Sequence, residues 1–199
     1  MVVMSLVAVP FHAAAVLLII SGMAKVRSPR TVMPMLAIVC ERVGAEVPAA
    51  RRWSAHGRAG RALGVIEVLL GLGCLLGSRI VAFGTVVAFA LLTDLLVAAR
   101  QRGVQATCYS TAATSTPTVL HIVSNLVAAI AVFVAALGSD VPSIWDALGS
   151  GPLAALPYLL AIAVGVAMVV RLAGPLGSGS VGAELGGRDN TEHWSESRR

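Results

Sequence analysis

Five polar side chains lie within or at the ends of long apolar runs: Lys25, Glu67, Asp94, His121 and Asn125. We call these five residues the polar layer, because the order of the runs predicts that they share one depth in a membrane. Ionisable groups inside a lipid-facing helix are costly, so each needs a partner or a role. One interpretation is a working site in which Glu67 and Asp94 are the acidic members and His121 titrates near neutral pH.

The same residues also allow a purely structural interpretation. Lys25 could form an ion pair with Glu67 or with Asp94. His121 and Asn125 lie one helical turn apart and could hydrogen-bond to the backbone or to neighbouring helices. The residue types leave both interpretations open.

Thiol chemistry is a second possibility. Cys108 lies in the polar stretch "QRGVQATCYSTAATSTPT", residues 101–118, and Cys40 lies in an earlier loop, whereas Cys74 lies within an apolar run. Thiol exchange needs a thiolate and a resolving partner. Cys108 and Cys40 would therefore carry any redox activity, and we assign no other catalytic residue. No CxxC pair or Cys/His spacing is present, so we predict no metal site.

The composition predicts a membrane protein. Of the 199 residues, 57% are hydrophobic and 13% are charged, whereas a soluble domain carries roughly 25% charged residues. The net charge of +5 arises from Lys and Arg that flank apolar runs, as expected for residues that set membrane orientation. We find no nucleic-acid motif, and the expected partner is the lipid bilayer.

The apolar runs predict five transmembrane helices, since about 20 residues cross a hydrocarbon core of about 30 Å. The runs are Val2–Ala24, Ala62–Ser78, Ile80–Ala99, Val119–Leu137 and Leu153–Leu172. We therefore expect an all-α integral membrane protein with a four-helix transmembrane bundle over 1–137. An external loop and a fifth transmembrane helix follow over 138–172. The Gly-, Ser- and charge-rich segment 173–199 is expected to be a disordered cytoplasmic tail.

Most of the 15 Lys and Arg residues lie in the first loop, the third loop and the C-terminal segment. The positive-inside rule then predicts an external N-terminus and a cytoplasmic C-terminus. Within the first loop, "TVMPMLAIVCERVGAEV" is too short to span, and we expect an amphipathic helix that covers one end of the bundle. His12 is expected to hydrogen-bond between helices, and Gly71, Gly73 and Gly84 to allow close helix packing.

Four segments in the same order resemble the methylamine utilisation protein E (MauE) family, which is related to the DoxX-like membrane proteins, and one of them is the "RG…C" loop after the third run. "SGMAKVRSP" at the end of the first run resembles the family's SG-x-x-K-x-x-x-P signature. Glu67 with the following "LLGLGCLLG", and "VLHIVSNLVAAIAV" in the fourth run, resemble two further segments. The resemblance covers about 9–137, and its motif residues are Ser21, Gly22, Lys25, Pro29, Glu67 and Asn125.

The resemblance implies a small helical bundle, similar in outline to vitamin K epoxide reductase and the disulfide-bond-forming membrane proteins. The named family member is implicated in maturation of the disulfide-rich subunit of methylamine dehydrogenase. In that family the loop after the third span resembles Cys-Gly-Cys-Phe-Gly. Here the loop reads Thr107-Cys108-Tyr109-Ser110, and Ser124 replaces the arginine that precedes Asn125. The missing second cysteine favours a non-enzymatic role.

Three functions follow as expectations. The first is an assembly or maturation factor, or an accessory subunit, of a membrane-associated redox complex of the respiratory or methylamine-dehydrogenase type. It would lie in the plasma membrane of a bacterium, bind a larger membrane protein complex and need no cofactor. The second is a thiol–disulfide oxidoreductase that uses Cys108 and Cys40, with quinone near Glu67 and Asp94. The third is a small-solute or proton transporter that uses the polar layer.

Overall fold

The computed structural model describes residues 2–43, 57–104, 119–138, 140–149 and 151–173. Every regular element in these parts of the chain is a helix. The elements are α1 (Val2–Arg27), η1 (Pro29–Val32), α2 (Met33–Val43), α4 (Arg58–Leu75), α5 (Arg79–Gln101), α6 (Val119–Leu137), α7 (Ile144–Gly149) and α8 (Pro152–Ala173). The predicted all-α class is confirmed. Of the tail expected over 173–199, Ala173 is the last residue of α8, and 174–199 lie outside the described residues.

Among the residues that the structure describes, three helices are long and apolar enough to cross a membrane. They comprise Val7–Arg27 of α1, Arg79–Gln101 (α5) and Val119–Leu137 (α6). The chain is therefore a helical membrane protein. The apolar part of α8, Ala155–Arg171, is shorter. Helix α4 overlaps the predicted span Ala62–Ser78 but is not among these three helices. Its 18 residues include Arg58, Arg61 and Glu67, and these charges lower its hydropathy.

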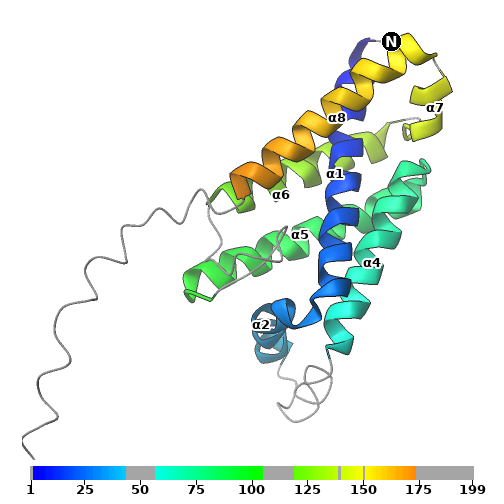
Figure 1. Ribbon diagram of the computed structural model, residues 1–199. Helices are drawn as coiled ribbons and strands as arrows, with labels where there is room; N and C mark the ends of the chain where they lie inside the picture. Colours follow the sequence, from blue (N-terminus) through cyan, green and yellow to red (C-terminus); the bar gives the residue numbers. More distant parts are fainter. Residues whose placement is uncertain (1, 44–56, 105–118, 139, 150, 174–199) are drawn as a thin grey trace, which may run out of the picture.

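Helix α4 runs antiparallel to α1, and α6 runs antiparallel to α5 (Figure 1). Figure 1 shows α4 returning beside α1, with α5 and α6 crossing this pair and α8 lying against α1. The core combines three large side chains, Phe11, Leu18 and Phe89, with many alanines. Small residues let helix backbones approach closely, which is the main source of helix association in lipid.

Apolar side chains also cover the outside of the bundle. On α5 they recur at helical spacing and are exposed: Ile80, Phe83, Val87 and Leu91. Comparable outward-facing residues occur on α4, α6 and α8. Such a surface suits a lipid environment, because exposed apolar area of this extent is unusual on a soluble monomer.

Two connections are tightly built. Helices α4 and α5 form the predicted hairpin, with Gly77 at a positive φ of 77° and Ser78 accepting a hydrogen bond from the backbone of Val81. The second connection joins α6 to α8 and contains α7, in the segment expected to be an external loop. The start of α7 is capped reciprocally, because the backbone N–H of Asp146 donates to Ser143 Oγ while the backbone N–H of Ser143 donates to Asp146 Oδ2. Hydrogen bonds from Ser143 lower the pKa of the Asp146 carboxyl.

Helix α2 corresponds to the amphipathic helix expected in the first loop. Met35 and Ile38 are buried against Leu96 and Ala99 near the end of α5. With 11 residues, α2 is too short to cross a hydrocarbon core that needs about 20. Helix α2 therefore covers one end of the bundle, as predicted.

Candidate functional site

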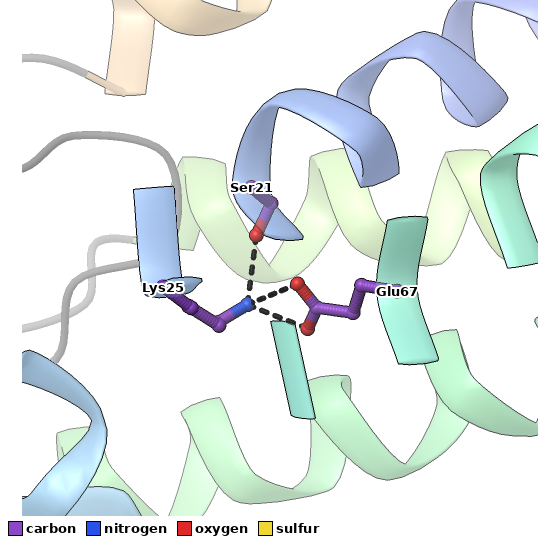
Figure 2. A network of polar contacts seen from close by, with 3 residues as sticks. All are labelled: Ser21, Lys25 and Glu67. Atoms are coloured by element: carbon purple, nitrogen blue, oxygen red, sulfur yellow. Dashed lines mark hydrogen bonds and ion pairs between the residues drawn. The ribbon is translucent and has the colours of Figure 1, made fainter. Parts of the chain in front are cut away.

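The candidate site lies where α1 and α4 cross. Ser21 and Lys25 are one turn apart on α1, so their side chains point to the same side of that helix. Glu67 lies on the buried face of α4, which it shares with Gly60, Gly64 and other small residues. Figure 2 shows the Lys25 ammonium between the Ser21 hydroxyl and the Glu67 carboxylate.

The Lys25 ammonium lies at the centre of a polar network. Its ammonium nitrogen, Nζ, donates to Glu67 Oε1 at 2.5 Å and to Glu67 Oε2 at 2.6 Å. It also donates to Ser21 Oγ at 2.7 Å. An ammonium group has three N–H donors, so these three acceptors can use all of them. The side chains are almost fully buried, with exposed fractions of 5% for Lys25 and 2% for Glu67.

Glycines on both helices make this short bridge possible. A Cβ atom added to Gly22 would lie 2.5 Å from the carbonyl oxygen of Gly64, and one added to Gly64 would lie 2.6 Å from that of Gly22. Further along, a Cβ on Gly71 would lie 2.6 Å from the carbonyl oxygen of Ala15. The two backbones are thus in direct contact. We call these positions the glycine contact.

The buried arrangement neutralises both charges. A lone ammonium or carboxylate at this depth would be poorly solvated, but each ion here has an oppositely charged partner within 2.6 Å. Because Glu67 is almost inaccessible and both its oxygens contact Nζ, this geometry suits a link between helices better than proton exchange with solvent.

The rest of the polar layer divides into two groups. Asn125 and His121 are buried on α6. Asp94 is not: its side chain is 57% exposed and forms an ion pair with Arg42 of α2. The common depth of the five residues in a membrane stays a prediction, but Asp94 does not share the burial of the other four. Helix α2 supplies a cation at the end of the bundle, which lets this carboxylate remain near the surface.

A second buried polar contact joins α1 to α8. The Nδ1 atom of His12 lies 2.9 Å from the carbonyl oxygen of Ala8 and also contacts the Tyr158 hydroxyl. The prediction that His12 hydrogen-bonds between helices is confirmed. No spacing rule in the sequence predicts Tyr158 as the partner of His12, because the two residues lie far apart in the chain.

The described cysteines do not form a disulfide. Cys40 on α2 is partly buried, and Cys74 is fully buried with its Sγ 3.3 Å from Thr85 Oγ1. Cys108 lies outside the described residues, so the possible Cys40–Cys108 pair stays a prediction. The part of the chain that the structure describes contains no group of three potential metal ligands among His, Cys, Asp and Glu.

Of the three glycines predicted to allow close helix packing, Gly71 and Gly73 do so, whereas Gly84 does not. Gly71 lies in the glycine contact, and a Cβ on Gly73 would lie 2.6 Å from Val81 Cγ1. Gly84 has room, because its nearest neighbour would be Leu70 Cδ2 at 3.5 Å. Gly60 and Gly64 also pack closely and were not among the predicted glycines. Their small-xxx-small spacing, typical of helix contacts in membranes, was the available signal.

Comparisons of the chain with protein-family models, with curated proteins and with solved structures find no match.

Proposed function

We propose that this chain is a MauE/DoxX-like membrane protein and acts as an assembly or maturation factor, or as an accessory subunit, of a membrane-associated redox complex. The buried polar network of Ser21, Lys25 and Glu67 carries the proposal. These motif residues bind one another, which suits a stable scaffold better than a site that turns over substrate.

The other motif residues of α1 and η1 support the same interpretation. Gly22 belongs to the glycine contact, and Pro29 lies against Gly60 at the start of α4. The two motifs that contain Lys25 and Glu67 therefore meet in one helix–helix contact. Because the motif residues lie at this helix–helix contact, we infer that the resemblance reflects the packing of the bundle.

The outer surface of the bundle provides room for a larger partner. Exposed apolar side chains on several helices can contact lipid or the transmembrane helices of another subunit. We propose five spans in the plasma membrane of a bacterium, with the N-terminus outside. A reporter fused after Arg199 should then be active only if it works in the cytoplasm, and an externally active fusion would contradict this orientation.

Copurification tests the main proposal. The tagged chain is extracted from its native membranes in mild detergent, and its partners are identified by mass spectrometry and by the absorbance of bound redox cofactors. We expect a stoichiometric membrane complex that carries a redox cofactor, and we expect cells without the chain to assemble that complex poorly. An unrelated tagged membrane protein of equal abundance is the control. A chain that purifies alone, with normal complex assembly in its absence, would contradict the proposal.

Thiol substitutions separate this role from the oxidoreductase alternative. We expect Cys108→Ser and Cys40→Ser to retain complex assembly, since "ATCYS" lacks a second cysteine. Maleimide-polyethylene glycol labelling before and after reduction measures the thiol state in membranes. A reductant-sensitive crosslink between these cysteines in most molecules, with loss of function in either variant, would instead support thiol–disulfide exchange.

A further inference from the structure

Four arginines gather where α1 ends and α4 begins. Arg27 ends α1, Arg30 lies in η1, and Arg58 and Arg61 lie in the first turn of α4. All four are exposed. We call them the α1–α4 arginine cluster. Figure 1 shows these two helix ends beside each other near α2.

Direct backbone contact holds the elements of the cluster together. A Cβ atom added to Gly60 would lie 2.3 Å from the carbonyl oxygen of Pro29, and one added to Gly57 would lie 2.9 Å from Pro29 Cγ. Because Gly60 lies between Arg58 and Arg61, and Pro29 lies next to Arg30, the packing places cationic residues of different elements in one neighbourhood.

These arginines differ from two others on the same end of the bundle. Arg42 and Arg102 form ion pairs with Asp94 and Glu41 respectively. Within the described residues, the side chains of the α1–α4 arginine cluster have no ion pair or hydrogen bond. Among the described residues, these four cations therefore have no carboxylate partner.

We expect the cluster to lie at the depth of lipid headgroups, from the length of α1. Helix α1 has 26 residues, so it is about 39 Å long and exceeds a hydrocarbon core of about 30 Å. Arg27 is its last residue, beyond the buried Lys25. The start of α4 adds a helix N-terminus without a side-chain cap at Gly57, and the N–H groups of a first turn favour an anion.

We propose that the α1–α4 arginine cluster binds the phosphate headgroup of an anionic phospholipid from the adjacent leaflet. Guanidinium groups bind phosphate oxygens in a bidentate manner, and basic residues beside membrane helices recognise anionic lipids. One headgroup held by arginines of α1, η1 and α4 links these elements at the membrane surface, close to the Lys25–Glu67 bridge. This binding is independent of the redox-complex role.

The test measures thermal unfolding of the purified full chain in detergent with added lipid. Phosphatidylglycerol should raise Tm by several degrees, whereas phosphatidylcholine with the same acyl chains and inorganic phosphate should not. The variant Arg27→Gln/Arg30→Gln/Arg58→Gln/Arg61→Gln should lose most of the shift. The matched control Arg42→Gln/Arg102→Gln should retain it, because those charges are already paired. Native mass spectrometry should show phosphatidylglycerol adducts that follow the same order.

Several results would overturn the proposal. One is a quadruple variant that keeps the full shift and its lipid adducts, and another is a control variant that loses both equally. An equal shift with inorganic phosphate would assign the site to a soluble anion, and an equal shift with phosphatidylcholine would indicate acyl-chain contacts. If the quadruple variant does not fold, Arg58→Gln/Arg61→Gln takes its place and should lose about half of the adducts. Unchanged adducts in that variant would also overturn the proposal.

Discussion

Two ion pairs join a cation early in the chain to a carboxylate on a later helix, and their surroundings differ sharply. Lys25 and Glu67 link α1 to α4, with side chains 5% and 2% exposed. Arg42 and Asp94 link α2 to α5, with side chains 44% and 57% exposed. In the sequence the two carboxylates look alike, since each interrupts an apolar run.

Burial determines what each ion pair does. Removing one partner of a buried pair leaves a charge with no compensation, which costs about 3–5 kcal/mol. An exposed pair is screened by solvent and salt, and it typically contributes about 0–1 kcal/mol. We therefore interpret the Lys25–Glu67 pair as part of the scaffold, and the Arg42–Asp94 pair as a weak tether for α2.

The largest expected effect comes from neutralising the buried acid. Glu67→Gln keeps the side-chain volume but leaves the Lys25 ammonium buried without a counter-charge. We expect a loss of about 3 kcal/mol or more in the free energy of unfolding, measured by thermal or chemical unfolding in detergent. If Glu67→Gln is as stable as the parent but abolishes complex assembly, the Lys25–Glu67 pair is a functional site. The two ion pairs would then not differ in their contribution to stability.

Neutralising both partners should restore part of that loss. In Lys25→Met/Glu67→Gln no lone charge remains, so the double variant should be more stable than Glu67→Gln alone. The coupling free energy expected for such contacting residues is about 1–3 kcal/mol. A double-mutant cycle with Lys25→Met measures it. Strict additivity of the two single changes would mean that the ions do not stabilise each other.

The glycine contact should be nearly as sensitive. In Gly64→Ala the new Cβ would lie 2.6 Å from the carbonyl oxygen of Gly22, so the helices must separate and the salt bridge must lengthen. We expect a loss of about 1–3 kcal/mol in the free energy of unfolding.

The matched control is Gly84→Ala, whose Cβ has ordinary contact distance to Leu70. This change should be neutral, or stabilising by up to about 1 kcal/mol, because alanine favours a helix over glycine. Equal destabilisation by the two substitutions would show that α1 and α4 do not depend on close backbone contact.

The exposed ion pair should have the smaller effect on unfolding. Asp94→Asn and Arg42→Gln should each change the free energy of unfolding by less than about 1 kcal/mol. Unfolding at low and high salt tests this expectation, since the small effect should fade as the ionic strength rises. A salt-independent loss of stability as large as that of Glu67→Gln would contradict the exposed position of Asp94.

The smallest expected effect concerns Asp146, an exposed carboxylate outside the spans, and it can be tested by changing the pH. The pKa of Asp146 is lowered in the folded chain by hydrogen bonds from Ser143. Its contribution to the α7 cap is therefore present above the unfolded pKa and is lost as the pH falls through the folded pKa. The protection of the α7 amides, measured as the ratio of the intrinsic to the observed hydrogen-exchange rate, should fall at acidic pH in the parent, and this fall should be absent from Asp146→Asn.

The sequence by itself determined the helical class and most helix positions. Helix α6 has the predicted bounds, Val119–Leu137, and α5 extends its predicted span by a residue or two at each end. The physical reason is local. A chain in lipid must satisfy its backbone hydrogen bonds within each helix, so an apolar run of sufficient length both identifies a helix and limits it. The sequence also narrowed the partner of Lys25 to two carboxylates.

The tertiary structure decided which carboxylate Lys25 binds. Periodicity along one helix gives the face of a residue but not the neighbour that this face meets. That choice depends on how closely two backbones approach, and here Gly22 and Gly64, which lie far apart in the chain, bring α1 against α4. Helix α2 meanwhile pairs with Asp94 at the end of the bundle. The contact between His12 and Tyr158 was likewise decided by packing, because its geometry exists only after α1 and α8 have met.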